Sequence, residues 1–160
     1  AAVVRDAALD AGAVEPDRPI TVDAPEPVVI TGDDGRLRQV VANLVANARV
    51  HTPVSAPLHL RAALQGDGPT ALAVVEVRDE GPGMAPEVAE RAFERFFRAD
   101  PARTRHTGGS GLGLSIVDAV VRAHGGTVSL DSAPGRGTTV RATFPLAPPV
   151  HDEPTDTETF

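Results

Sequence analysis

Hydrophobic residues along the middle of the chain follow two periods, and each period predicts a different element. Between residues 34 and 50 the apolar positions recur three and four residues apart, as on one buried face of a helix. Asp34 is a suitable residue to cap the start of this helix. Between residues 58 and 64 apolar and polar residues alternate, which predicts a half-buried strand. The helix stripe consists of Leu37, Val40, Val41, Leu44, Val45 and Ala48.

Shorter patterns predict the remaining elements. A helix is expected over residues 112–124, because Gly125 and Gly126 follow the apolar periodicity directly. A second, short helix is expected over residues 86–97, with a proline in its first turn. Residues 97–109 show no period and predict a mobile loop. Apolar runs bounded by turn residues predict strands at 20–22, 28–31, 71–79, 127–131 and 138–144.

Two of the strand pairs are joined by turns that are too short for a crossover, so these pairs must be antiparallel. The chain therefore predicts an α+β fold: a two-layer sandwich with a mixed, mostly antiparallel sheet and about three helices on one face. Residues 20–146 form the expected domain. Residues 1–19 are interpreted as the end of a linker, and the Pro-, Thr- and acid-rich residues 147–160 as a disordered tail.

Composition narrows the possible functions. The chain has 160 residues, no cysteine and a net charge of −7, and all fifteen basic residues are arginine. This length suits one domain, and the acidic balance gives no support for nucleic-acid binding. Any nucleotide would have to be held by local features rather than by the overall field. No apolar run is long enough to span a bilayer.

Two polar signals interrupt the apolar patterns. Asn43 and Asn47 are four residues apart, so they lie on one side of the predicted helix, at the edge of its apolar stripe. They are either a polar pair bonded to backbone or neutral oxygens for phosphate and a divalent ion. Asp79 shares a strand face with Val77, and a buried carboxylate there needs a donor, such as an adenine amino group. Alternatively, Asp79 simply begins an ordinary turn with Gly81.

Two glycine-rich segments add further candidates. Residues 108–114 contain four glycines directly before a helix, where free N–H groups and the helix dipole favour phosphate. The segment lacks the lysine of a P-loop and the spacing of a dinucleotide fingerprint, and a flexible hinge is the alternative. Thr138 follows a second glycine pair. Strand alternation directs Thr138 and Asp79 toward the same layer, between the sheet and the helices.

Together, in this order, these segments resemble the ATP-binding catalytic domain of bacterial sensor histidine kinases. Residues 37–53 are similar to the N box, 79–83 to the G1 box, 93–98 to the F box, 109–114 to the G2 box and 135–138 to the last glycine motif. The resemblance covers residues 20–146. It implies the Bergerat-type ATP-binding fold shared by histidine kinases, DNA gyrase, Hsp90 and MutL, with ATP and Mg²⁺ as ligands.

The resemblance also implies residue roles. Asp79 would accept the adenine amino group with support from Thr138, Asn47 would bind Mg²⁺, and Asn43 would lie beside the phosphates. Residues 97–110 would form the ATP lid, and Arg98 would reach the terminal phosphate. The catalytic residues would be Asn43 and Arg98. The ATP-binding residues would be Asn43, Asn47, His51, Asp79, Gly81, Gly83, Gly109, Gly111, Leu112, Gly113 and Thr138.

One position departs from the family pattern. The family often has a basic residue three positions after the second asparagine, but here that position is Val50 and the arginine is Arg49. One residue turns a helical side chain by about 100°. We therefore expect Arg49 to be solvated without a ligand role, and Arg98 or His51 to matter more.

The position one helical turn before the Mg²⁺-binding asparagine distinguishes hydrolytic ATPases from kinases within this superfamily. Gyrase-like and Hsp90-like members carry a carboxylate there that activates water, whereas Asn43 cannot act as a general base. The expected activity is therefore phosphorylation of a histidine in two-component signalling. A nucleotide-sensing or anti-sigma-like interaction module is the alternative, and a degenerate domain that binds no nucleotide is a third.

None of the five histidines lies in a phosphoacceptor pattern. The chain is therefore interpreted as a fragment whose expected partners are the dimerisation and phosphoacceptor domain of the same kinase and a cognate response regulator, with no nucleic acid. The isolated domain is expected to be a monomer and the full-length protein a homodimer. The expected location is the cytoplasmic side of a membrane-bound sensor kinase.

Overall fold

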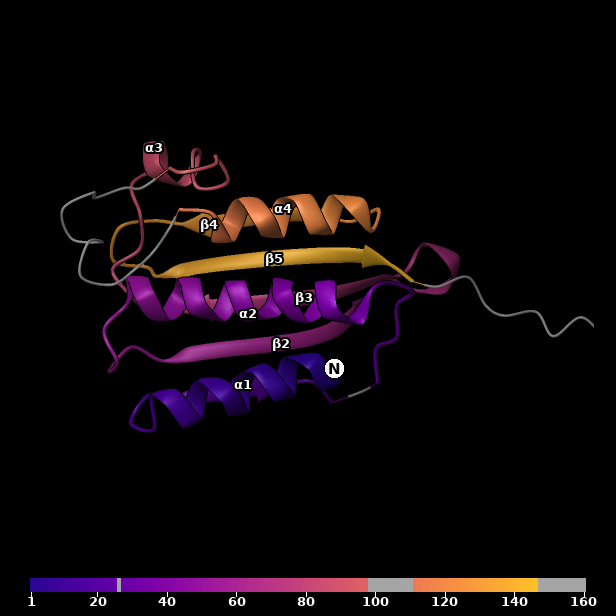
Figure 1. Ribbon diagram of the computed structural model, residues 1–160, viewed down its shortest axis with the longest axis horizontal. Coiled ribbons are helices and arrows are strands. Elements are labelled where there is room, and N and C mark those ends of the chain that lie inside the picture. Colours follow the sequence, from indigo (N-terminus) through magenta and orange to yellow (C-terminus); the bar gives the residue numbers. More distant parts are fainter. Residues whose placement is uncertain (26, 98–110, 147–160) are drawn as a thin grey trace, which may run out of the picture.

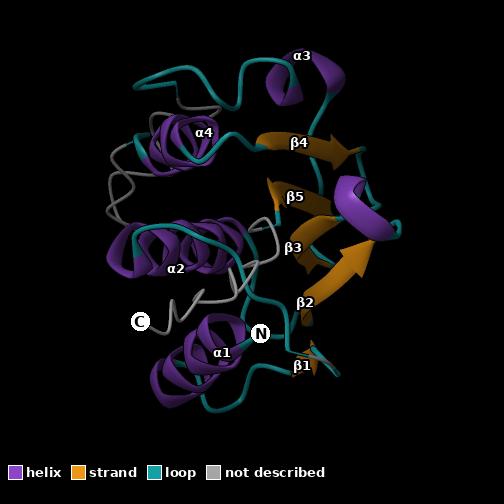
Figure 2. Cartoon of the chain, turned by 90° about the vertical axis from the view of Figure 1, so that its right-hand side faces the viewer, coloured by secondary structure: helices purple, strands orange, loops and turns teal. Residues whose placement is uncertain are grey.

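A five-stranded sheet forms one layer of the molecule, and helices cover one of its faces (Figures 1 and 2). The computed structural model describes residues 1–25, 27–97 and 111–146. The strand order is β1-β2-β3-β5-β4; β1 runs parallel to β2, and the other neighbours are antiparallel. The predicted α+β fold class is confirmed. The strands are β1 (Ile20–Asp23), β2 (Leu58–Gln65), β3 (Leu72–Asp79), β4 (Thr127–Ser132) and β5 (Thr138–Pro145).

Helices α2 (Asp34–His51) and α4 (Gly113–Ala123) match the two strongest sequence predictions. The true N-cap of α2 is Asp33, one residue before the predicted cap, and its carboxylate accepts a hydrogen bond of 2.9 Å from the Arg36 N–H. The buried stripe of α2 packs against the inward faces of the strands, where Leu58 and Val140 are among the buried residues. This layer forms the hydrophobic core.

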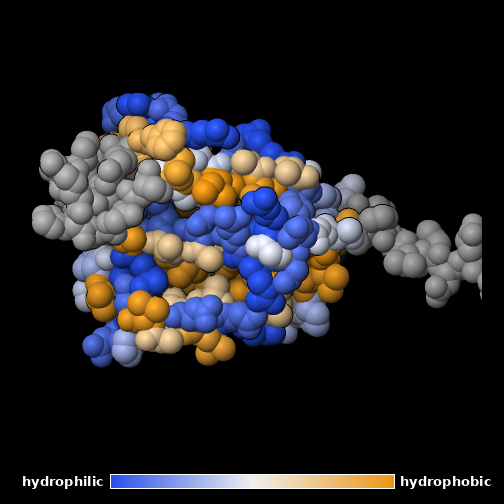
Figure 3. Space-filling model, viewed as in Figure 1, coloured by the Kyte–Doolittle hydropathy of each residue, from blue (hydrophilic) through white to orange (hydrophobic). Residues whose placement is uncertain are grey.

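Helix α1 (Ala2–Val14) was not predicted, because the sequence analysis interpreted residues 1–19 as the end of a linker. It lies beside α2 on the helical face of the sheet (Figure 2) and buries Val4, Ala8 and Ala11 in the same core as the rest of the fold. Leu9 and Val14 remain exposed. Hydrophobic side chains accordingly appear at the surface in the lower part of Figure 3, where α1 lies.

The third helix on the covered face is therefore α1, and not the predicted helix at residues 86–97. That helix is only one turn long, α3 (Pro86–Ala89), and turns follow it up to a left-handed residue at Phe96, which has φ 61°. A non-glycine residue in this region cannot continue a right-handed helix.

The strand predicted at residues 28–31 is absent, so that prediction was wrong. Val28 and Ile30 pack against the core and Val29 is exposed, which reproduces the alternation of a strand without its hydrogen bonds. The sheet edge beside β2 is already occupied by β1. A short 3₁₀ turn, η1 (Gly68–Thr70), connects β2 to β3. The predicted lid loop, apart from Phe97, and the predicted tail lie outside the described residues.

Candidate functional site

The candidate residues from four separate segments meet at one end of the two layers. Asp79, the last residue of β3, is paired directly with Thr138, the first residue of β5. His124, which caps the end of α4, accepts a hydrogen bond of 3.2 Å from the Asp33 N–H at the start of α2. The two helices are therefore antiparallel, and the start of α4 lies at the same end as the last turn of α2, toward the left of Figure 1.

Asp79 is a buried carboxylate, with 5% of its surface exposed. Its Oδ1 accepts a hydrogen bond of 2.9 Å from the Gly81 N–H. Burial raises the pKa of Asp79, while backbone hydrogen bonds from Gly81 and Thr138 and the charges of His51 and Arg18 act in the opposite direction. An acid held at the mouth of a core against its desolvation cost is typical of a functional residue.

Thr138 is buried beside Asp79, as strand alternation predicted. Its hydroxyl lies 2.9 Å from that of Ser132, which also accepts a hydrogen bond from the Met84 N–H and donates one to the Gly137 carbonyl. The sequence analysis missed Ser132. Because Ser132 is the register partner of Thr138 across the predicted hairpin, the pairing pattern could have identified it.

Two glycines allow the loop after Asp79 and the β4–β5 turn to approach each other closely. A Cβ on Gly137 would lie 2.0 Å from the Asp79 carbonyl oxygen, and one on Gly83 would lie 1.9 Å from that of Ala133. Both glycines also have φ near +70°. A side chain at either position would therefore separate the two loops. Gly81 is similarly close to Thr52: its Cβ would lie 2.3 Å from the Thr52 Cγ2.

Helix α2 carries the candidate amides in its C-terminal half and an imidazole, His51, as its last residue. Asn43 and Asn47 are half-buried, and the buried Nδ2 of Asn43 has no hydrogen-bond partner among the described residues. An unpaired buried amide is costly unless a ligand satisfies it. Desolvation lowers the pKa of His51, and the charge of Asp79 partly opposes this effect, so the imidazole lies within electrostatic reach of the carboxylate.

The second glycine segment is described only from Gly111 onward. Gly111 has φ +70°, and its carbonyl accepts a hydrogen bond of 3.0 Å from the Phe96 N–H. Leu112 caps α4 and Gly113 is its first residue, so the N–H groups of the first turn lie at the shared end of the layers. The other two candidates, Gly109 and Arg98, lie outside the described residues.

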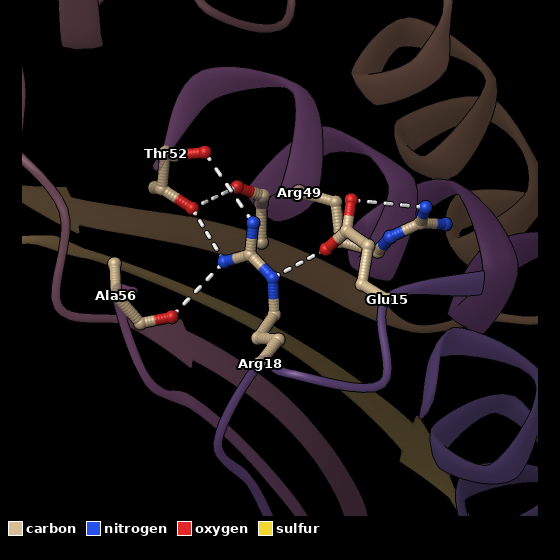
Figure 4. Close-up of polar contacts among 6 residues, drawn as sticks. Glu15, Arg18, Arg49, Thr52 and Ala56 are labelled. Atoms are coloured by element: carbon tan, nitrogen blue, oxygen red, sulfur yellow. Dashed lines mark hydrogen bonds and ion pairs between the residues drawn. The ribbon is translucent and has the colours of Figure 1, made fainter. Parts of the chain in front are cut away.

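Arg49 is only partly exposed and has a protein partner, which corrects the expectation of a solvated side chain. Its guanidinium forms an ion pair of 3.1 Å with Glu15, just beyond the end of α1 (Figure 4). The Arg49 side chain leaves the helix about 100° away from the direction of position 50, which is consistent with this contact. In the same cluster Arg18 is 4% exposed, and its guanidinium is bonded to Glu15, Thr52 and Ala56. No sequence motif indicated this cluster, because its members are scattered between residues 15 and 56.

The oxygens of the candidate residues can be compared with what a protein-held metal and a nucleotide-bound Mg²⁺ each require. In the described part of the chain no group of three or more His, Cys, Asp or Glu side chains could hold a metal ion. Mg²⁺ usually takes one or two protein oxygens and completes its shell with waters and phosphates. The unpaired Asn43 N–H can donate to a phosphate oxygen, and the amide oxygen of Asn47, one turn later, is of the kind that Mg²⁺ takes as a ligand.

Comparisons with known proteins agree with this geometry. Residues 32–148 match the family described as histidine kinase-, DNA gyrase B- and HSP90-like ATPase. The chain is 49% identical over 131 residues to the probable sensor histidine kinase TcrY of Mycobacterium tuberculosis, covering 81% of this chain and 27% of that protein. It is 37% identical over 121 residues to sensor histidine kinase WalK of Bacillus subtilis, covering 76% and 20%.

Solved structures give the same result. The chain superposes on the mycobacterial sensor histidine kinase MprB with a TM-score of 0.75 at 31% identity, covering 91% of this chain and 93% of that one. The catalytic domain of histidine kinase ThkA has a TM-score of 0.72 at 22% identity, which supports the fold alone. Of the helices that the structure describes, none has the length and apolar character required to cross a membrane.

Proposed function

Since the chain belongs to the family of histidine kinase-, DNA gyrase B- and HSP90-like ATPases, we propose that it binds ATP with Mg²⁺ and supplies the γ-phosphate to a histidine on a separate domain. The observation that carries the proposal is the buried Asp79 carboxylate, which is paired with Thr138 and lies within electrostatic reach of His51 in the last turn of α2. The resemblance to sensor histidine kinases stated from the sequence is confirmed by the relatives.

Asp79 would recognise the base. A buried carboxylate beside Thr138 can accept a hydrogen bond from the adenine amino group, and the glycines that follow it permit close approach of a flat ring. His51 would lie along the same side of the nucleotide, because it follows Asn43 and Asn47 at four-residue intervals on α2.

The asparagines and the start of α4 would hold the phosphates. Asn47 would offer its amide oxygen to Mg²⁺, and Asn43 its unpaired N–H to a phosphate oxygen. The backbone N–H groups around Gly111, Leu112 and Gly113 would bind further phosphate oxygens at a helix N-terminus. Bound Mg²⁺ would supply charge neutralisation for the triphosphate. Gly109 and Arg98 are proposed as further contacts from the lid.

The site is better suited to transfer than to hydrolysis. Asn43 occupies the position one turn before Asn47, and an amide cannot take a proton from water. Phosphoryl transfer depends mainly on positioning and on stabilising charge, so a domain with these residues can hold ATP until a nucleophile arrives.

The chain spans only 27% of the length of TcrY and 20% of that of WalK. The histidine that would accept the phosphoryl group is proposed to lie outside this chain. We assign it to the dimerisation and phosphoacceptor domain of the same kinase, with a response regulator as the next recipient. The homodimeric full-length protein would be a membrane-bound sensor with this domain in the cytoplasm. The related structure of ShkA was solved in complex with AMPPNP, which supports nucleotide binding here.

Mixing this chain with its separately produced phosphoacceptor domain and γ-labelled ATP tests the proposal. We expect an acid-labile label on the acceptor histidine, and a much weaker label at limiting ATP when Asn47→Ala replaces the wild type. ATP binding without any labelled histidine would overturn the kinase assignment and favour a nucleotide-sensing interaction module.

A further inference from the structure

We propose that Arg18 is a positioning residue of the adenine site: its buried guanidinium, acting through Thr52 and the loop before β2, fixes the orientation of Gly81 and Asp79. The inference rests on the proposed function, because it assigns a supporting residue to the site that would recognise adenine. Arg18 lies between α1 and β1, outside every motif that the sequence analysis singled out.

The Arg18 side chain is almost completely enclosed and uses its donors on three segments. Nε bonds Glu15, Nη1 bonds the Thr52 hydroxyl at 2.9 Å and the Ala56 carbonyl at 3.0 Å, and Nη2 bonds the Thr52 carbonyl at 3.4 Å (Figure 4). The Thr52 hydroxyl in turn donates to the Ala48 carbonyl at 2.7 Å. A planar guanidinium with several fixed partners holds the C-terminal end of α2 in one position.

Thr52 connects this cluster to the candidate site by direct packing. Its methyl group lies against Gly81, where even one added carbon would be 2.3 Å from Cγ2. The Gly81 N–H then donates to the Asp79 carboxylate at 2.9 Å. Movement of Thr52 would therefore move the donor that orients Asp79.

A second connection runs through the backbone. Arg18 donates a hydrogen bond to the Ala56 carbonyl. The carbonyl of the next residue, Pro57, accepts a hydrogen bond of 3.1 Å from the Glu80 N–H, and Glu80 follows Asp79 directly. The Leu58 N–H also donates to the Pro19 carbonyl at 2.9 Å, and Leu58 is the register partner of Asp79. Two independent paths thus join Arg18 to the end of β3.

The charge of Arg18 supports the same role. Burial raises the pKa of Asp79, and Arg18 and His51 are the charged groups that lower it. An ionised carboxylate is a stronger acceptor for the adenine amino group than a protonated one, which must also place its own O–H. Arg18 therefore favours the form of Asp79 that would bind the base.

Comparing ADP with inosine diphosphate isolates this role, because the two nucleotides differ at the position of the adenine amino group and share their phosphates. We expect Arg18→Met to lower the ratio of ADP affinity to inosine diphosphate affinity about tenfold, the loss expected when an acceptor is misplaced. Thr52→Val replaces the hydroxyl with a methyl group and keeps the methyl that packs against Gly81, and we expect a reduction of about threefold. Both affinities are measured by calorimetric titration on protein shown to be folded by circular dichroism.

Arg38→Met is the matched control. Arg38 also joins α1 to α2, through Asp6 and Asp34, but it is exposed and outside the cluster. We expect its ratio to equal that of the wild type. If Arg18→Met does not fold, Thr52→Val decides the matter alone. An unchanged ratio in the folded variants would overturn the inference.

Asp79→Asn separates this inference from the proposed function. If Asp79→Asn abolishes the preference for ADP while Arg18→Met and Thr52→Val retain it, Asp79 recognises adenine without help from Arg18. If Asp79→Asn also retains the preference, the assignment of Asp79 is wrong and the role of Arg18 fails with it. A combined Arg18→Met/Asp79→Asn variant should show no further loss beyond Asp79→Asn, because both changes remove the same contact.

Discussion

Burial of the Asp79 side chain disfavours the charged form of its carboxyl group. The carboxylate has a raised pKa because it is desolvated at the end of β3, where it is paired with Thr138. A group whose pKa is higher in the folded than in the unfolded state costs stability above its folded pKa. This cost disappears as the pH falls below the ordinary value of an unfolded aspartate.

Asp79→Asn should therefore stabilise the nucleotide-free protein near neutral pH by about 1 kcal/mol, because the amide still accepts from the Gly81 N–H and carries no charge. The gain should shrink as the pH is lowered through the pKa of Asp79. Urea unfolding of both proteins across pH measures this difference. A variant that is less stable than wild type at every pH would show that Asp79 is structural.

Asn47 offers a test of the metal contact. Asn47→Ala should weaken ATP binding in the presence of Mg²⁺ by about tenfold, while binding measured with a chelator should change little. Titrations with and without Mg²⁺ give both values. Gln39→Ala, at an amide about two turns earlier on the same helix, serves as control. Equal losses in both conditions would remove the ligand role of Asn47.

At the scale of elements, α1 is the feature that the sequence did not reveal. Its stripe of Val4, Ala8 and Ala11 is short, and alanines and aspartates on the other face gave no clear period. Small side chains allow the helix to pack closely beside α2, but they contribute weakly to any hydrophobic pattern. The side chains of α1 are buried by the rest of the core, and that packing is visible only in the tertiary structure.

Val4→Ala should destabilise the fold by about 2 kcal/mol, because Val4 is 1% exposed within the main core. Leu9→Ala on the same helix is the control, since Leu9 is 73% exposed and should change stability little. Urea unfolding of the two variants measures the difference. Equal stability of both would mean that α1 is not part of the cooperative unit.

The sequence predicted the elements with strong periodicity and the residues that alternation places. Helix α2, the β4–β5 hairpin and the shared layer of Asp79 and Thr138 follow from patterns within one segment or between adjacent strands, whereas the direct pairing of Asp79 with Thr138 was found only in the structure. The strand expected at residues 28–31 failed because strand propensity cannot say which sheet edge is free. Arg18 was missed for a related reason: its partners lie up to 38 residues away.

At the scale of the whole molecule, the fold gathers the site from segments distant in sequence. The antiparallel arrangement of α2 and α4, and of β3 and β5, brings their functional ends together. The cluster around Arg18 then joins α1 to that same end. The net charge of −7 opposes an anionic ligand at long range, so phosphate binding must come from local N–H groups and Mg²⁺.

Calorimetric titration of the chain with a non-hydrolysable ATP analogue and Mg²⁺ tests the central claim most directly. The account predicts one nucleotide bound per chain, with affinity lost for both ATP and ADP in Asp79→Asn, because the mutation acts on the base and not on the phosphates. The absence of saturable binding by the folded wild-type chain, or unchanged affinities for both nucleotides in Asp79→Asn, would contradict it.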